Sequence, residues 1–550
     1  MEITVKTIEA AEKILGVTYT DAERKLMVSN LAPQIETALR RRSVSLPNGM
    51  APALRFDPRL PGFPTPPAPT SPVWSNAAPG PLPDRDSDIA FAPVARLRHW
   101  IACGDLTSER LTHIYLKRIE AHDGKLNSFV TVLAESALAE AKAMDALMAA
   151  GTNLGPLHGI PYALKDIFDA AGTRTTWGAE PFADRIAEAD AAIVTRLRAA
   201  GAVLLGKSAV GALAYGDVWL GKKTRNPWNL EEGSSGSSAG SGAATAAGLC
   251  GFSIGTETLG SITSPSERCG ATGLRPTYGR VSRAGCMALC WSLDKVGPIC
   301  RSVEDTAIVL HALNGGDPQD PGSIDIPFNY NAQASLEGVR VGYLEAAYTD
   351  KNATAFDHAT LDRIKKIGLD LRPVTLEELP YEALIASLYA EAAASFEELT
   401  LSGADDTLTR QDDGAWPNAF RKARFLSAVD HVQLDRMRRH AMHALDKLFQ
   451  DVDFLIGPMS TGPMLTASNF TGQPCLQIRA GFETLASREE LSLAEGRLDL
   501  GESGCEGVLH SVPRGLSIWA GLFDESRLLN LGAFLETQFD VANDQPIGFN

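Results

Sequence analysis

The chain has 550 residues, a formal net charge of −16 and 44% hydrophobic residues, so it is long enough for several domains and apolar enough for a substantial core. Its acidic balance argues against a nucleic-acid partner, because nucleic-acid-binding surfaces are usually basic, and eight cysteines are too few here for a disulfide scaffold. No apolar run reaches the roughly 18 residues that a membrane span needs, and the N-terminal segment lacks the apolar core of a signal peptide. We therefore expect a cytoplasmic protein without a membrane partner, and no cysteine spacing suggests a metal site.

Residues 6–44 predict two helices. Thr20 and Glu23 have the spacing of a capping box at the start of the second helix. Apolar residues recur along that helix at helical spacing, although Pro33 is expected to kink or break it. We assign residues 1–46 to an N-terminal helical extension.

Residues 47–87 form a proline-rich arm. Twelve prolines between positions 47 and 83 exclude a helix or an interior strand. Such a segment is either a loose linker or an extended arm that lies over the main domain. Because Phe56, Phe63 and Trp74 supply apolar anchors, the docked arm is favoured.

Strands and helices alternate from residue 88 onward. Short apolar runs predict strands at Ile160–Leu164, Val203–Leu205 and Leu249–Ile254, and Ile193–Ala200 predicts a helix. This alternation indicates an α/β fold with a mixed β-sheet core surrounded by helices. We assign residues 88–550 to one domain.

The segment Gly233–Thr272 is the most informative part of the chain. It has eight glycines and eight serines between Gly233 and Ser264, a composition that a flexible linker would share. Helix-forming Ala243–Ala247 and the apolar run Leu249–Ile254 argue instead for glycines that let backbones approach closely inside a packed domain.

Two other interpretations of this segment fail on context. Gly236–Gly240 matches the Gly-x-Ser-x-Gly elbow of α/β-hydrolases with Ser238 as nucleophile, but the preceding residues are turn-forming rather than an apolar strand. A phosphate-binding loop is excluded because no Gly-Lys-Ser/Thr follows the glycines.

The segment resembles the amidase signature family. The matching blocks are Gly236-Ser-Ser-Ala-Gly-Ser241, Gly255-Thr-Glu-Thr-Leu-Gly-Ser-Ile262, Cys269-Gly270, Gly273-Leu-Arg-Pro-Thr277 and the lysine segment Gly155–Asp166. The resemblance covers about residues 88–315 strongly and 450–540 more loosely. It implies the amidase signature fold, with a variable substrate-side region at about 320–450.

The resemblance also implies a Ser-Ser-Lys triad made of Lys165, Ser237 and Ser261. Ser261 would attack the carbonyl, and Ser237 would relay its proton to a neutral Lys165, whose pKa burial would lower. The family's bridging serine follows a cis peptide bond, which predicts a cis Gly236–Ser237 bond, and Ser238 would support the loop. The backbone N–H groups that would hold the oxyanion are those of Thr258, Leu259, Gly260 and Ser261.

Three positions depart from the family pattern. Glu257 replaces an aspartate, Leu259 replaces a glycine and Thr263 replaces an arginine. Leu259 is expected to narrow or redirect the acyl pocket, and loss of the arginine removes a positive charge near the nucleophile.

These departures favour a hydrolase acting on a neutral apolar or aryl amide, with carbamates and esters as further substrates and no cofactor. The partner would be a small-molecule acyl substrate, and a homodimer is left open. One alternative is the A-type component of an amidotransferase that works in a complex. The other is a non-catalytic binding protein on the same fold.

Overall fold

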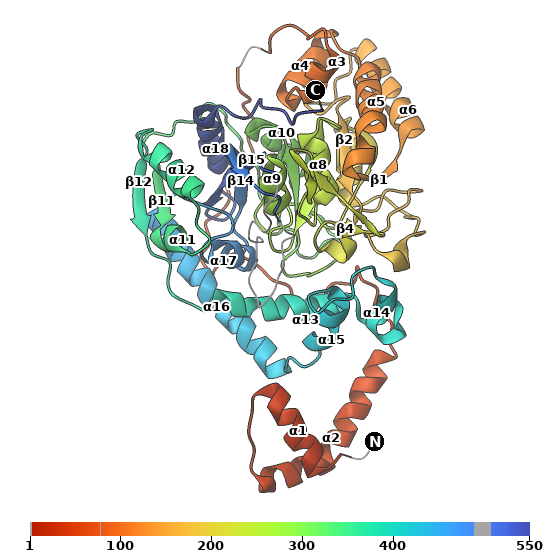
Figure 1. The fold of residues 1–550 in the computed structure, drawn as a ribbon, viewed down its shortest axis with the longest axis vertical. Helices are drawn as coiled ribbons and strands as arrows, with labels where there is room; N and C mark the ends of the chain where they lie inside the picture. The colour runs from red at the N-terminus through yellow and green to blue at the C-terminus, as the bar shows by residue number, and fades with distance from the viewer. Residues whose placement is uncertain (1–2, 77–78, 489–507, 550) are drawn as a thin grey trace.

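The computed structural model describes residues 3–76, 79–488 and 508–549. Its centre is an 11-stranded sheet in the order β1-β3-β2-β8-β10-β9-β14-β15-β13-β11-β12, surrounded by helices (Figure 1). The predicted α/β class is therefore confirmed. No helix among these residues is long and apolar enough to cross a membrane.

The large sheet is mixed. β2 runs parallel to both β3 and β8, and β11 runs parallel to β12 and β13, whereas the other neighbours are antiparallel. Its strands are β1 (Phe129–Val132), β2 (Pro161–Lys165), β3 (Val203–Ser208), β8 (Phe252–Glu257), β9 (Thr272–Arg275), β10 (Lys295–Cys300), β11 (Arg340–Leu344), β12 (Asp370–Val374), β13 (Phe454–Gly457), β14 (Cys475–Leu485) and β15 (His510–Ala520). Two small ribbons pair β4 (Val218–Trp219) with β5 (Lys222–Lys223) and β6 (Arg225–Asn226) with β7 (Asn229–Gly233).

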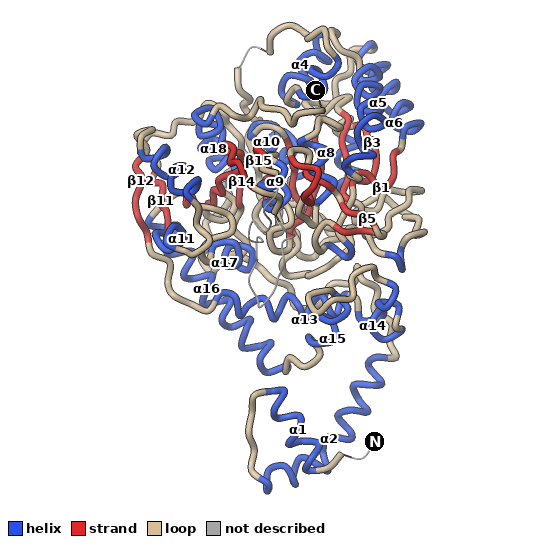
Figure 2. The backbone as a smooth tube through the Cα atoms, viewed as in Figure 1, coloured by secondary structure: helices blue, strands red, loops and turns tan. Residues whose placement is uncertain are grey.

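The helices cover the sheet and extend the molecule at its N-terminus (Figure 2). They are α1 (Val5–Leu15), α2 (Asp21–Arg42), α3 (Asp86–Phe91), α4 (Val94–Cys103), α5 (Ser108–Leu126), α6 (Ala134–Ala149), α7 (Ala192–Ala199), α8 (Ala239–Ala246), α9 (Thr263–Cys269), α10 (Val303–Leu313), α11 (Glu345–Thr349), α12 (Ala355–Lys365), α13 (Ile385–Ser395), α14 (Glu397–Ser402), α15 (Trp416–Ala423), α16 (Ala428–Asp451), α17 (Met464–Thr471) and α18 (Glu525–Phe539).

The helical extension forms a hairpin that stands away from the main body, at the bottom of Figure 1. The predicted capping box is present, with the Thr20 side chain accepting from the Glu23 N–H and the Glu23 side chain accepting from the Thr20 N–H. Pro33 lies inside α2 without ending it, so the predicted break was wrong. The apolar residues of α2 were expected to form a packed face, but Ile35 and Leu39 are about half exposed.

The proline-rich arm returns to the body and lies along it. The ring of Phe56 packs edge-on against Tyr278 at 5.1 Å, and Phe63 packs against Phe523 at 5.9 Å. Trp74 contacts Tyr330 and His311. All three predicted anchors therefore make contacts, and this segment lies against the domain rather than hanging free.

The Gly/Ser segment lies at the centre of the body. Between Gly233 and Thr272 every residue is buried except Gly236, Glu267 and Gly270. A Cβ at Gly240 would lie 2.1 Å from the carbonyl oxygen of Ser128, so only glycine allows this helix to pack so closely. The linker interpretation is thus excluded.

Two element boundaries in this segment differ from the prediction. The helix starts at Ala239 rather than Ala243, because small Gly and Ser residues are tolerated in a helix that is wholly buried. The strand starts at Phe252 rather than Leu249, since Gly248 takes a positive φ of 65° and closes α8 with a turn that uses Leu249. Apolar character alone does not mark where such a turn ends.

Candidate active site

Lys165 is the last residue of β2, and its side chain is fully buried. Its Nζ donates to Ser237 Oγ at 2.9 Å, Ser238 Oγ at 3.0 Å and Thr256 Oγ1 at 2.8 Å. Burial lowers the pKa of Lys165 to about 7, against a smaller opposing effect of neighbouring acidic groups that begins with Cys286. At neutral pH this amine is therefore able to accept a proton.

The two serines that bond Lys165 come from the turn that begins α8. The Gly236–Ser237 peptide bond is cis, as the resemblance implied. Ser238 is fixed at both ends, because its Oγ donates to the Thr256 carbonyl oxygen at 3.1 Å and accepts from the Thr256 N–H at 3.2 Å. Ser238 thus lies where the supporting role placed it.

Ser238 is also the serine of the Gly-x-Ser-x-Gly match. The strand before it, β7, pairs only with β6 and is not part of the large sheet. An α/β-hydrolase elbow needs a strand of the main sheet at this point, so that interpretation is excluded.

Ser261 stands in the turn between β8 and α9. Gly260 has a φ of +88°, a conformation that favours glycine. Ser237 and Ser261 line the same cavity, of about 40 Å³, but within the described part of the chain no hydrogen bond joins their hydroxyl groups. The geometry thus assembles the Lys165–Ser237 contact and leaves the second contact of the predicted relay unformed.

The turn presents a row of unpaired donors. In the described parts of the chain, no acceptor bonds the backbone N–H groups of Thr258, Leu259, Gly260 and Ser261, whereas the following two N–H groups are bonded. Buried N–H groups are rarely left unpaired, so a run of them is suited to binding an anion or a polarised oxygen.

The turn is held from behind by Glu257, the residue that replaces the family aspartate. Its Oε2 accepts from the N–H groups of Ile262 and Thr263, each at 2.9 Å, and its Oε1 accepts from Arg275 Nη1 at 2.7 Å. Burial by itself would raise the pKa of Glu257, but the charge and hydrogen bond of Arg275 lower it to about 2. Glu257 therefore remains ionised and fixes the first turn of α9.

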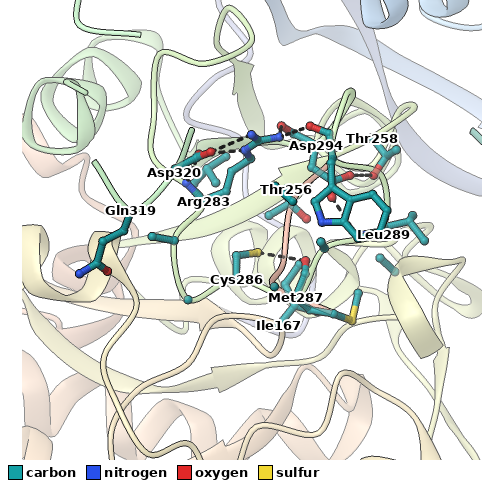
Figure 3. Close-up of a pocket in the computed structure, with 18 of the residues that line it drawn as sticks. Ile167, Thr256, Thr258, Arg283, Cys286, Met287, Leu289, Asp294, Gln319 and Asp320 are labelled. Atoms are coloured by element: carbon teal, nitrogen blue, oxygen red, sulfur yellow. Dashed lines mark hydrogen bonds and ion pairs between the residues drawn. The ribbon is translucent and has the colours of Figure 1, made fainter. Parts of the chain in front are cut away.

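The small cavity opens toward a larger chamber of about 180 Å³ (Figure 3). Three residues line both spaces: Ala214, Thr258 and Leu289. Leu259 lines the small cavity together with Leu388 and Trp416, as expected for a side chain that narrows the pocket. The predicted substrate-side region thus supplies part of the wall, but the loop 283–296 supplies most of the chamber.

The cavities hold no unpaired cation. Among the described residues that line them, Arg283 is the only lysine or arginine, and its guanidinium is paired with the Asp320 carboxylate at 2.9 Å. Asp294 is also occupied, since it accepts from Thr258 Oγ1 at 2.6 Å and from the Leu289 N–H at 2.8 Å (Figure 3). The pocket is therefore suited to a neutral group.

Sequence reasoning missed three contributors. Thr256 and Arg275 lie within the quoted motifs, so their blocks marked them without indicating their contacts. Asp294 lies outside every motif, and no sequence signal would have found it.

This site occurs on a chain whose residues 110–529 match the family model for amidases. The chain belongs to the amidase family. This amidase-family chain is 34% identical to the A-type component of the glutamyl-tRNA(Gln) amidotransferase of Pseudomonas syringae pv. syringae (strain B728a), over 83% of its own length and 99% of the relative.

Solved structures agree with this assignment. The native peptide amidase from Stenotrophomonas maltophilia superposes with a TM-score of 0.70 at 27% identity, covering 84% of this chain and 100% of that chain. A chain from the vestigial protein complex that reveals the evolutionary origins of an s-triazine catabolic enzyme gives the same TM-score at 28% identity, covering 81% and 98%. The family predicted from the motifs is thus confirmed.

Proposed function

We propose that this amidase-family chain hydrolyses the C–N bond of a neutral apolar or aryl amide through an acyl-enzyme on Ser261. The observation that carries the proposal is the buried, readily deprotonated Lys165 bonded to Ser237 at 2.9 Å, with Ser237 and Ser261 on one cavity wall. A buried lysine is costly unless it has a use, and a lowered pKa is what a general base requires.

In the proposed reaction Ser261 Oγ forms a bond to the amide carbon while its proton passes to Ser237 Oγ. Ser237 gives its own proton to Lys165 Nζ, which becomes the ammonium ion. The oxyanion binds the unpaired N–H groups of the turn that ends at Ser261. The same relay returns the proton to the amine, the C–N bond breaks, and water then hydrolyses the ester by repeating the steps.

The character of the pocket supports a neutral substrate. The one lining arginine is neutralised by Asp320, and Thr263 stands where the family has an arginine. A substrate carboxylate close to the scissile bond would therefore be desolvated without a partner. Esters and carbamates have the same acyl carbon, so they are expected to be turned over by the same residues.

Similarity to the amidotransferase components favours a second candidate, a component that releases ammonia from an amide within a complex. The two candidates differ in what the isolated chain does. A hydrolase turns over simple anilides alone, whereas a component of that kind requires its partners for full activity.

The test is a panel of anilides, aliphatic amides, aryl esters, carbamates and free glutamine with purified protein. We expect turnover of neutral anilides and a mass increase of the acyl group on Ser261, both absent in Ser261→Ala. The matched control is Ser266→Ala, a buried serine of α9 whose Oγ donates only to a backbone carbonyl. Turnover by Ser261→Ala at the wild-type rate would refute the nucleophile.

A further inference from the structure

The proline-rich arm reaches the chamber beside the candidate active site. Pro47–Met50 form a β-turn closed by the Met50 N–H donating to the Pro47 carbonyl at 2.8 Å. Gly49 and Ala51 line the 180 Å³ chamber, while Asn48, Met50 and Ala51 line an outer groove of about 900 Å³. The turn therefore separates the inner space from the outer one, with Ala51 on both.

Asn48 fastens this turn. Its Nδ2 donates to the carbonyl oxygens of Ala288 at 2.8 Å and Ser395 at 3.3 Å, and its Oδ1 accepts from the Ala288 N–H at 2.8 Å. The Asn48 carbonyl oxygen accepts from Trp291 Nε1 at 3.3 Å. One asparagine thus ties the arm both to the loop that forms the chamber and to the end of α13.

The small side of the turn faces inward. Gly49 and Ala51 are the least bulky residues available, and they leave the chamber its depth. A cavity of about 150 Å³ is enough to hold a benzene ring, so a chamber of about 180 Å³ accepts a group of that size. A longer group would have to displace the turn.

We propose that the turn 48–51 is the end wall of the substrate pocket and sets the length of the group that the substrate extends into the chamber. The proposal rests on the proposed function, since the chamber joins the cavity that Ser237 and Ser261 line. Phenyl-sized groups fit, and longer para-substituted groups fit only when the turn opens toward the outer groove. The N-terminal part of the chain is thus a specificity element, although it lies outside the residues that match the family.

The arrangement predicts opposite effects for two substitutions. Asn48→Ala removes the bonds that hold the turn, so it should raise the affinity for long ligands relative to short ones. Ala51→Phe fills the chamber, so it should lower the affinity for phenyl-sized ligands relative to acetamide. A methylene that meets a wall changes affinity by about tenfold or more, which sets the size of the expected shift.

Binding is measured by calorimetry on Ser261→Ala protein, so that the result does not depend on turnover. The ligands are acetamide, benzamide and benzamides with para-alkyl groups from methyl to hexyl. We expect a break of about tenfold within the alkyl series, which Asn48→Ala moves to longer groups. Leu54→Phe is the matched control, because Leu54 is in the same arm, is 93% exposed and lines neither space.

The outcomes separate the two proposals. Affinity without a break, or a break that neither Asn48→Ala nor Ala51→Phe moves relative to Leu54→Phe, overturns the end wall, as does failure of every ligand to bind. A break that both variants move, in a protein whose wild type cleaves no amide, supports the end wall and overturns the proposed hydrolase.

Discussion

The segment Gly233–Thr272 and the N-terminal extension and arm are opposite solutions to positioning a chain. The first is buried almost throughout, and its glycines and serines place backbone and hydroxyl groups within bonding distance of one another. The second is largely exposed and is held at separate points by Asn48, Phe56 and Trp74. A buried segment fails as a unit, whereas an anchored arm loses its contacts one at a time.

The sharpest test of the buried segment is Ser261→Ala. Because the nucleophile, relay and base act as one unit, we expect kcat to fall by about 10⁴–10⁶-fold. Burst kinetics and unfolding in denaturant would be measured together. A fall in activity with unchanged stability is expected, while Ser266→Ala should stay within about tenfold of wild type in kcat. Equal losses in both variants would point to disrupted packing instead.

Lys165 links burial to a pH dependence. Its pKa is lowered to about 7, and only the neutral amine accepts a proton, so kcat/KM should rise with pH through about 7 and level off above it. Lys165→Arg keeps the positive charge but cannot lose its proton, and it should reduce kcat by about 10³-fold or more. A pH profile flat from acidic to alkaline values, with chemistry rate-limiting, would exclude a lysine base.

Glu257→Gln tests the support behind the nucleophile turn. The substitution leaves the buried Arg275 without its carboxylate, so the free energy of unfolding should fall by about 3–5 kcal/mol. Equilibrium unfolding in urea measures the change. The comparison is Glu397→Gln, which breaks the Arg41–Glu397 pair at the base of the extension, where partial exposure limits the loss to less than about 1 kcal/mol. Similar losses at the two sites would contradict the contrast between the regions.

The smallest effect is expected in the arm itself. Phe56 is partly buried against Tyr278, and Phe56→Ala should weaken docking by about 1–2 kcal/mol, whereas the exposed Leu54→Ser should change stability by less than about 0.5 kcal/mol. Limited proteolysis of residues 47–76 would report the opening of the arm without global unfolding. Faster cleavage of Phe56→Ala alone would match the anchored arrangement, and equal rates for both variants would not.

Much of this protein was determined by its sequence alone. Local chemistry located the capping box at Thr20, and the proline spacing excluded helix from the arm, because both depend on neighbouring residues. The blocks around Lys165, Ser237 and Ser261 identified the family, and the cis Gly236–Ser237 bond followed from that likeness. The roles of these three residues are still predictions.

The tertiary structure decided which distant groups meet. Arg275 neutralises Glu257 across 18 positions, and Asn48 bonds Ala288 across 240, so no local pattern could reveal either contact. The extent of the helix that contains Pro33 and the exposure of Ile35 and Leu39 were likewise set by what the rest of the chain leaves uncovered. Side chains of one type serve as anchors or remain in solvent according to which surface the fold brings to them, and that surface is assembled from segments far apart in sequence.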